Sequence, residues 1–274
     1  MGTILEELTW PQAKAALERV KTVVIPTGSI EQHGPHMPLG TDYLVARELA
    51  SRVGKISPVI VAPAIPVGYA DYHADFPGTL SLSEETLTRV YEEIAGYFVG
   101  YGATHIVFLN GHGGNLGSLQ RACATLRRKD VLAATILWWE AAAALNPEWS
   151  LIGHGDFIET SLMLAINEAI VDLGQAKPPV RRNLSDRLIL NDIHDCRFES
   201  GLIHVALRTK DYTESGDMIE YGASPGADHS VPPTAATAAR GEEILKTVAQ
   251  YTARFIDAFS EVHLPLGGQK GGIH

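Results

Sequence analysis

Short apolar runs alternate along the chain with longer stretches in which apolar residues recur every three or four positions. The runs are rich in β-branched residues and are bounded by turn-forming residues, which predicts short buried strands. They lie at residues 22–27, 58–63, 104–109 and 131–138. The stretches between them have the periodicity of helices that bury one face. Strands that alternate with single helices predict an α/β fold with a mainly parallel sheet covered on both faces.

Capping residues predict where the helices begin and end. Thr41 is the expected N-cap of a helix that starts at Asp42, and Ser83 is the expected N-cap of a helix that ends on Gly102. The expected helices cover residues 42–53, 84–102, 116–129, 159–173 and 234–259.

Residues 174–235 are less regular, and their one strand candidate is 202–207, in which His204 is expected to be a core histidine. No linker-like tract of Ser, Gly and Pro separates this region from the rest of the chain, so we interpret it as an irregular part of the same domain. The sequence therefore predicts a single domain over residues 1–262 and a disordered tail at 263–274.

Composition narrows the class of protein. The 22 lysines and arginines against 32 aspartates and glutamates give a net charge of −10, which argues against a nucleic-acid or anionic-membrane partner. The first residues lack a signal-peptide pattern, and no apolar run approaches the roughly 18 residues of a membrane span. Cys123 and Cys196 lack the spacing of a metal or disulfide motif, and Cys123 is expected to be a buried structural thiol. We expect a cytoplasmic protein.

The segment GSIEQHGPHMPLGTD, residues 28–42, places two histidines and two carboxylates directly after the first predicted strand. Glu31 and His33 are two positions apart, so both side chains leave an extended backbone on the same side. Asp42 follows a turn of glycine and proline. Carboxylate oxygens and neutral imidazole nitrogens are ligands of hard or borderline divalent metals. A capping role for Asp42 and a solvated Glu31 are the alternatives, but the combination at the carboxyl end of a buried strand favours a metal site.

A second loop, NGHGGN at residues 110–115, follows the strand at 104–109. His112 is the side chain in its middle that can ligate a metal, and the flanking asparagines can orient the loop or a substrate. The glycines let the backbone approach a ligand closely or adopt positive φ. A phosphate-binding loop is the competing interpretation, but neither the P-loop lysine nor GxGxxG is present.

A third cluster, GHGDFIETS at residues 153–161, leads into a predicted helix. His154 and Glu159 are its candidate functional residues, although Glu159 and Asp156 could also serve only to stabilise the helix start. With Glu159 as a ligand, the donors suit two divalent ions with one bridging carboxylate, a site that activates water as hydroxide and polarises a carbonyl. The full metal-ligand set would be Glu31, His33, Asp42, His112 and Glu159.

Five other residues have weaker signals. His73 either points into a pocket or lies in a surface loop, and Trp139, at the end of a predicted strand, could wall a substrate site. His36 is interpreted as structural or as a neighbour of the ligands, because five other residues already fill the coordination. Asp228 lies with His229 in a loop that has too little context to rank.

Together these segments resemble the creatininase (creatinine amidohydrolase) family. The similarity runs from about residue 8 to residue 260, and the first and fourth of the matching segments together are highly specific. The segments are LTWPQ, PTGSIEQHGPHMPLGTD, HADFPGTLSL, FLNGHGGN, HGDFIETSLML and TAATAARGEEIL. The resemblance implies a three-layer αβα fold, a hydrolase with two divalent ions (zinc, manganese or both, with iron as a further option), and a homohexamer.

The resemblance also implies roles for individual residues. Glu31, Asp42 and His112 would hold one ion, with Asp42 bridging to a second ion held by His33. His154 would match a family histidine that moves protons or contacts substrate. One position departs from the pattern, because Gly114 stands where creatininases carry an acid. The second ion therefore needs another ligand, for which Glu159 is the candidate, and a substrate other than creatinine is expected.

The function that the sequence favours is hydrolysis of a C–N bond in a small cyclic amide or formamide, by a metal-bridging hydroxide that attacks the carbonyl. His154 and Glu159 are the candidate catalytic residues, and Gly113 and Gly114 would leave room for a substrate that also contacts His73 and Trp139. The first alternative is a hydrolase that cuts a C–C bond of a cyclic diketone such as a diketo-inositol. The second is a non-catalytic metabolite-binding protein.

Overall fold

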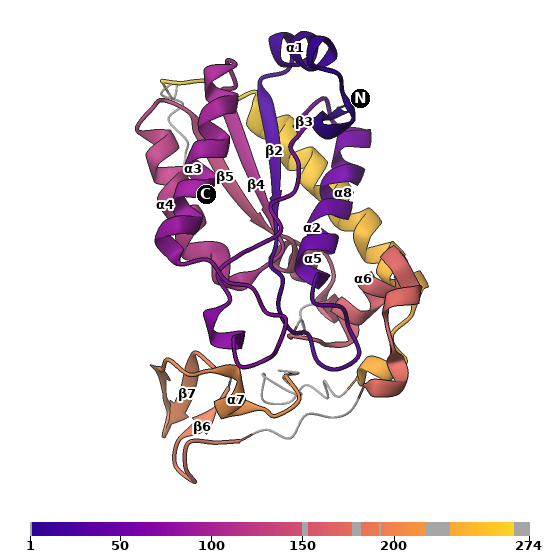
Figure 1. Cartoon of the computed structure of the whole chain (residues 1–274), viewed down its shortest axis with the longest axis vertical. Helices are drawn as coiled ribbons and strands as arrows, with labels where there is room; N and C mark the ends of the chain where they lie inside the picture. Colours follow the sequence, from indigo (N-terminus) through magenta and orange to yellow (C-terminus); the bar gives the residue numbers. More distant parts are fainter. Residues whose placement is uncertain (1, 150–152, 177–181, 192, 217–230, 266–274) are drawn as a thin grey trace, which may run out of the picture.

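A five-stranded parallel sheet forms the centre of the computed structural model, which describes residues 2–149, 153–176, 182–191, 193–216 and 231–265 (Figure 1). The strand order is β1-β3-β2-β4-β5, and each neighbouring pair is parallel. The strands are β1 (Thr3–Ile4), β2 (Thr22–Thr27), β3 (Ile60–Val61), β4 (His105–Asn110) and β5 (Leu132–Leu137). This arrangement confirms the predicted α/β class.

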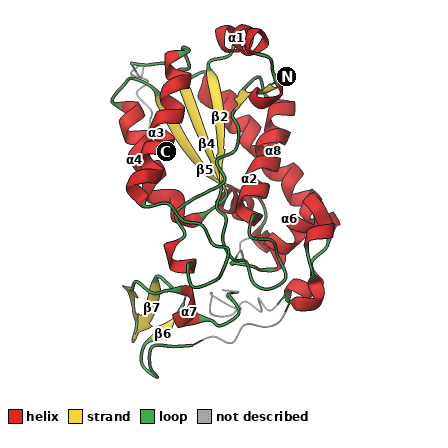
Figure 2. Cartoon of the chain, in the orientation of Figure 1, coloured by secondary structure: helices red, strands yellow, loops and turns green. Residues whose placement is uncertain are grey.

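Helices cover both faces of this sheet, which gives three layers (Figure 2). Alternate residues of β2 divide between the layers: Val24 packs with one set of helices, and Val23 and Ile25 pack with the other. On the Val24 side lie α2 (Thr41–Ile56), α5 (Trp138–Leu145), α6 (Phe157–Asn167) and α8 (Ala238–Ser260); on the other side lie α1 (Trp10–Arg19), α3 (Glu84–Gly100) and α4 (Leu116–Arg127). Parallel strands buried on both faces explain the continuous apolar runs in the sequence.

The register brings the carboxyl ends of the strands to one edge of the sheet. Thr27 of β2 pairs with Asn110 of β4, which pairs in turn with Leu137 of β5. The segments rich in histidine and carboxylate follow β2 and β4, so both emerge at this edge. Open α/β sheets bind their ligands there.

A smaller antiparallel sheet lies beyond the same edge (Figure 1). It consists of β6 (Ile189–Leu190), β7 (Asp195–Phe198) and β8 (Gly201–His204), and the short helix α7 (Thr209–Tyr212) follows it. Four buried residues, Leu190, Ile193, Cys196 and Tyr212, form its apolar cluster, against which Tyr72 packs. We call residues 182–216, without the undescribed residue 192, the cap segment.

The prediction for His204 is wrong. The residue does lie on a strand, but its side chain is 86% exposed and its Nδ1 contacts Asp195 Oδ1. Every residue of β8 is exposed among the described residues, and the strand forms an edge of the small sheet. Apolar neighbours in the sequence therefore did not imply burial.

Several predicted boundaries also shift. Thr41 is the first residue of α2 rather than its cap, and Gly40 takes the N-cap position. Trp138 begins α5 instead of ending a strand, so Trp139 also lies on a helix. Ser83 is confirmed as the N-cap of α3, where its Oγ accepts a hydrogen bond from Thr86 N at 3.2 Å.

Short 3-10 turns join these elements, and two of them shape the site described below. They are η1 (Leu5–Glu7), η2 (Asp71–His73), η3 (Gly113–Asn115), η4 (Pro147–Trp149), η5 (Glu168–Ile170), η6 (Leu173–Gln175) and η7 (Pro233–Ala235). In the described part of the chain, every helix is too short or too polar to cross a membrane.

Candidate metal centre

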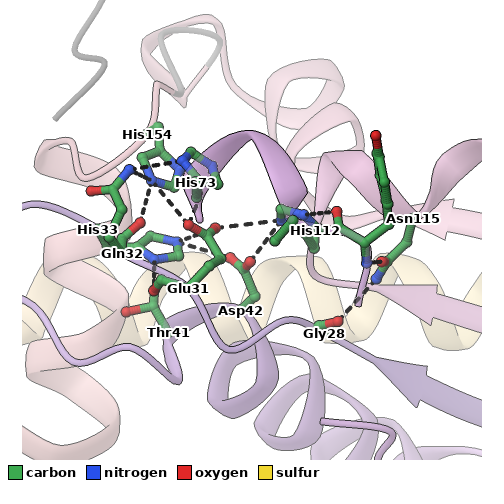
Figure 3. Close-up of polar contacts among 12 residues, drawn as sticks. Gly28, Glu31, Gln32, His33, Thr41, Asp42, His73, His112, Asn115 and His154 are labelled. Carbon is green, nitrogen blue, oxygen red and sulfur yellow. Dashed lines mark hydrogen bonds and ion pairs between the residues drawn. The ribbon is translucent and has the colours of Figure 1, made fainter. Parts of the chain in front are cut away.

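Seven ionisable side chains from five parts of the chain converge beyond the carboxyl edge of the sheet. Figure 3 labels all of them except Glu159. They come from the loop after β2, the start of α2, η2, the loop after β4, and the approach to α6. The residues are Glu31, His33, Asp42, His73, His112, His154 and Glu159. All five ligands predicted from the sequence lie in this cluster.

Asp42 is the central residue, because each of its carboxylate oxygens contacts a different histidine. Oδ1 lies 2.9 Å from His33 Nε2, and Oδ2 lies 2.9 Å from His112 Nδ1. Asp42 occupies the first turn of α2, where the helix dipole stabilises a negative charge. Each oxygen of Asp42 therefore lies beside a different potential ligand nitrogen.

Two glycines let α2 start close against the strand ends. A Cβ on Gly28 would lie 2.4 Å from the backbone nitrogen of Tyr43, and one on Gly111 would lie 2.3 Å from the carbonyl oxygen of Asp42. Side chains at these positions would push the first turn of α2, and Asp42 with it, away from the two loops. The two glycines therefore allow the backbone of both loops to approach the backbone of α2 closely.

Hydrogen bonds orient both histidines that contact Asp42. His112 Nε2 donates to the carbonyl of Tyr69 at 2.9 Å, which leaves Nδ1 to face the centre. His33 Nδ1 lies 3.2 Å from the carbonyl of Glu31, which leaves Nε2 to face it. Metal-binding histidines usually have such a partner on the second nitrogen, because it fixes the tautomer and the ring orientation.

The loop that carries His112 is braced by asparagines, as the sequence suggested. Asn115 Nδ2 donates to Gly28 O at 3.0 Å and its Oδ1 accepts from Tyr69 N at 3.0 Å, so it ties three loops together. Asn110 Nδ2 donates to His112 O at 2.6 Å. The asparagines thus orient the loop itself.

Glu31 is fully buried, and neither of its carboxylate oxygens has a hydrogen-bond partner. Oε1 lies 3.5 Å from His112 Nδ1 and 3.7 Å from His33 Nε2, whereas Oε2 lies 3.2 Å from His73 Nε2 and 3.4 Å from His154 Nε2. Buried carboxylate oxygens almost always have partners, and among the described residues no lysine or arginine pairs with Glu31, Asp42 or Glu159. The donor set and its unmet charge fit divalent cations.

Three sets of ligand atoms in this cluster lie close enough together to hold an ion. One set is Glu31, Asp42 and His112; a second is His33, His154 and Glu159; a third is Glu31, His73 and His154. The atoms of each set lie within 4.8 Å of one another.

Glu159 reaches the centre from the first turn of α6. Asp156 caps this helix by accepting from Glu159 N at 2.8 Å, as one of the sequence interpretations had it. Glu159 Oε2 accepts from Gly155 N at 2.8 Å and lies 3.8 Å from His33 Nε2. The side chains of His154 and Glu159 are 14% and 10% exposed, more than the other members of the cluster. Solvent therefore reaches the centre from their side.

Burial and crowding shift the pKa values of these groups. Burial raises the pKa of Glu31 well above its ordinary value and raises that of Glu159 to about 8. Burial also raises the pKa of Asp156 to about 7. For His33 burial acts to lower the pKa, but the surrounding carboxylates outweigh it and the pKa is raised. Protons on these groups therefore offset the crowded negative charge when no cation is bound.

We expect the metal-free protein to lose stability as the pH rises from about 6.5 to 8. Below this range the lowered pKa values of His36, His73 and His154 act in the opposite direction, because these rings bind protons only on unfolding. Glu159 and Asp156, with their raised pKa values, hold protons in the folded chain that they release on unfolding, so stability falls with pH. His33 adds to this fall above its unfolded pKa near 6.5, because its raised pKa stabilises only the protonated form. Thermal unfolding of metal-free and metal-loaded protein at several pH values tests this. A metal-free protein with a constant or rising Tm would contradict it.

The space beside Gly114 is already occupied, which corrects the expectation that it leaves room for substrate. A Cβ there would lie 2.2 Å from Tyr69 O, 2.6 Å from the Tyr72 hydroxyl and 2.7 Å from His112 Nε2. A Cβ on Gly113 would meet nothing within 4 Å. An acid at position 114 is incompatible with the present positions of these tyrosines, and only Gly113 leaves open space.

Gly114→Ala is therefore expected to destabilise the protein by about 1–3 kcal/mol, the usual cost of overpacking. It should also weaken metal binding, because the new methyl group would displace His112. Gly113→Ala is the matched control, since its methyl group enters open space. Thermal unfolding and metal titration of both variants measure the effect. Equal behaviour of the two variants would show that the crowding at Gly114 is relieved without cost.

Two residues that complete the centre, Gln32 and Thr209, were missed from the sequence, and the position of a third, His73, was left open. His73 is buried, and its ring stacks on that of His154 at 4.7 Å, so it does not lie in a surface loop. Gln32 and Thr209 contact it, and both are buried. Gln32 lies in the sequence between two predicted ligands, and this position could have identified it as part of the centre. Thr209 is distant in sequence from all the predicted ligands, so no sequence feature pointed to it.

The remaining candidates lie outside the cluster. His36 is buried and its Nε2 lies 3.0 Å from Thr160 Oγ1, and burial together with His33 lowers its pKa to about 4. Trp139 is half-buried and packs against the apolar layer formed by α2, α6 and α8, and its contact with substrate stays a prediction. Cys123 is half-buried on α4. Asp228 and His229 lie outside the described residues.

Comparison with known proteins identifies what this arrangement resembles. The family model for creatininase, described as creatinine amidohydrolase, matches residues 6–256. The mycofactocin precursor peptide peptidase of Mycobacterium tuberculosis is 42% identical over 116 residues, which cover 39% of this chain and 46% of that protein. This chain thus matches about half the length of that relative.

Two further relatives act on different substrates by name. The creatinine amidohydrolase of Pseudomonas putida is 32% identical over 189 residues, covering 61% of this chain and 73% of that protein. The 3-dehydro-scyllo-inosose hydrolase of Thermotoga maritima is 31% identical over 113 residues, which cover 41% of this chain and 36% of that protein.

Solved structures match nearly the whole chain. A mutant creatininase superimposes with a TM-score of 0.72 at 25% identity, covering 94% of this chain and 99% of that one. A structure named Creatininase Mn gives a TM-score of 0.66 at 25% identity. The match covers 94% of this chain and 99% of that one.

Proposed function

Because this chain belongs to the creatininase family, we propose that it is a metal-dependent hydrolase with two divalent ions, zinc or manganese. In this proposal Glu31, Asp42 and His112 hold one ion. His33 and Glu159 hold the other, and Asp42 bridges the two ions.

The observation that carries this proposal is the set of buried carboxylate oxygens that lack partners. Both oxygens of Glu31 and Oδ2 of Asp42 have no hydrogen-bond partner, although histidine nitrogens surround them at 2.9–3.7 Å. Leaving such groups unpaired is costly, and burial lowers the pKa of His73 and of His154, which disfavours a positive charge on these two rings. Divalent cations would satisfy the oxygens and the charge together.

The chain's own residues would place the substrate and move protons. When bound, the two ions would supply hydroxide at neutral pH and polarise a carbonyl group. His154 lies on the solvent side of the centre, where a substrate would arrive. Burial and the neighbouring His33 lower its pKa, so the ring is neutral and can take up a proton and pass it to the leaving group. Gly113, with open space beside it, would face the substrate.

We propose that the bond cleaved is the C–N bond of an amide. Two of the three named relatives, an amidohydrolase and a peptide peptidase, cleave amide bonds by name. Tyr72 and Gly114 fill the position where creatininases carry an acid, so the substrate would differ from creatinine.

The alternative is a C–C hydrolase of a cyclic diketone, which the inosose hydrolase relative supports. Hydroxyl-binding residues at the entrance would favour a polyol. Two acids lie on or just after η2: Asp75 already pairs with Arg208 at 3.0 Å, whereas Asp71 is exposed. This pairing weakens the case for a polyol.

A substrate panel on zinc- and manganese-reconstituted protein tests the proposal. The panel would contain lactams, formamides, short peptides and cyclic diketones, with the Asp42→Asn variant as the blank. Amide turnover that depends on Asp42 would support C–N hydrolysis. Turnover of diketones alone would favour the alternative, and two bound ions without any turnover would contradict a hydrolase for these classes.

A further inference from the structure

We infer that two copies of this chain associate through a surface formed by helix α1 and the end of α3. We call it the α1 surface, and it comprises Trp10, Lys14, Leu17, Glu18, Tyr97 and Tyr101. The occupant that fits this surface is a second copy of the chain, related to the first by a two-fold axis. The association does not depend on the proposed metal chemistry.

The three most exposed large hydrophobic side chains among the described residues belong to the α1 surface. Trp10 is 79% exposed, Tyr97 is 70% exposed and Tyr101 is 57% exposed. Tyr97 lies one helical turn before Tyr101, so both side chains leave the end of α3 on the same side. Single exposed apolar residues are ordinary, whereas a group of them on one surface marks an interaction site.

A groove of about 620 Å³ runs between α1 and the end of α3, and Trp10 and Tyr101 both line it. The residues of α1 that face the groove recur every three or four positions from Trp10 to Glu18, so one whole face of the helix borders it. On the other face of α1, Ala16 is the buried residue. Helices of about ten residues are marginal by themselves, so α1 depends on packing for its stability.

The shape of the α1 surface is complementary to itself. It carries a projecting indole, Trp10, next to an apolar groove to which Leu5, Leu8 and Leu17 contribute. In a two-fold contact the same patch lies on both sides, so the projection of each copy meets the groove of the other. Antiparallel pairing of the two α1 helices would place each Trp10 beside the partner's Leu17.

The charges of the α1 surface are also complementary to themselves. Lys14 and Glu18 both border the groove, with exposed side chains one helical turn apart. Antiparallel helices would bring each Lys14 within reach of the partner's Glu18, which gives two compensating pairs across the axis. A chain with a net charge of −10 repels its own copy over most of its surface, so local compensation favours contact here.

The exposed aromatic area is large enough to contribute substantially to a stable dimer. An aromatic side chain buries about 150–250 Å² when it is fully covered, so Trp10, Tyr97 and Tyr101 still offer about 300–500 Å². A stable interface takes about 800 Å² from each partner, and these three side chains supply roughly half of it. The leucines that line the groove add to this area.

The α1 surface lies away from the metal centre. Helix α1 precedes β2 and Tyr101 precedes β4, so the surface belongs to the amino edge of the sheet, whereas the ligands follow the carboxyl edge. Figure 1 shows α1 at the opposite end of the molecule from the cap segment. Association through α1 would therefore leave both metal centres open to substrate.

Trp10→Glu tests the surface through the mass of the full chain in solution, measured by light scattering and sedimentation over a range of concentrations. A buried tryptophan anchor is worth about 30-fold or more in affinity, so the variant should lose its partner and halve the mass of the assembly. Leu202→Glu is the control, because Leu202 is 55% exposed on the cap segment. A monomeric parent chain, an unchanged mass in Trp10→Glu, or an equal loss in Leu202→Glu would overturn the inference.

Exchanging the charges tests whether the occupant is a second copy. Lys14→Glu and Glu18→Lys each place like charges across the axis, and each variant should self-associate about 5-fold or more weakly than the parent. A mixture of the two variants restores opposite charges at both contacts and should form the mixed dimer. A mixture that associates no better than either variant alone would overturn the two-fold arrangement. Metal content should stay unchanged in both variants, so failure here is distinguishable from failure of the proposed function.

Discussion

Asp42→Asn is expected to abolish tight binding of both ions and to reduce hydrolysis to the level of the metal-free protein. Each oxygen of Asp42 lies 2.9 Å from a different histidine, so both proposed ion positions depend on this residue. Loss of a residue outside the ligand shell typically costs 10–100-fold in metal affinity. Loss of a shared ligand should therefore cost more than about 100-fold at each position.

Metal content by elemental analysis and affinity by chelator competition would measure this effect. Asparagine keeps the volume of the side chain, so circular dichroism should show a folded protein. Asp172→Asn is the control, because Asp172 is an exposed capping residue away from the cluster, and asparagine caps equally well. An Asp42→Asn protein that retains two ions and normal turnover would refute the two-metal proposal.

Local signals in the sequence were sufficient for the elements that position the centre. The strand predicted at 22–27 is β2, and the loop after it carries Glu31 and His33 as expected. A fully buried parallel strand leaves a continuous apolar run, and its glycines and histidines mark the functional end. These features need no knowledge of distant parts of the chain.

Boundaries depended on contacts that a linear pattern does not contain. The predicted strand at 58–63 shortens to Ile60–Val61 because it has prolines at both ends, and proline cannot donate to a ladder. The start of α5 at Trp138 replaces the end of a predicted strand, and the alanines after it favour the helix.

The role of His73 could not be predicted because it depends on a remote partner. Its loop reads as polar and turn-rich, which is typical of the surface. Thr209, 136 residues further along the chain, buries it and contacts its ring. The residues next to His73 and Thr209 in the sequence do not indicate that the two side chains are in contact. Only the folded structure shows this contact.

Glu159→Gln is expected to lower the bound metal from two ions to about one for each chain and to reduce turnover strongly. Glu159 is the carboxylate grouped with His33 and His154, on the opposite side of the cluster from Glu31 and His112. With Gly114 in place of an acid, the second ion has no other carboxylate of its own among the described residues. The metal-free variant should unfold at a higher temperature than the parent near pH 8, because it no longer buries a carboxyl whose pKa is raised to about 8.

Elemental analysis separates this outcome from a general loss of structure, and Glu168→Gln, an exposed position just after α6, is the control. Unchanged stoichiometry in Glu159→Gln would move the second ion to another set of ligands. The set of Glu31, His73 and His154 would then be the next candidate. The metal count of this variant therefore decides directly between the two ligand assignments.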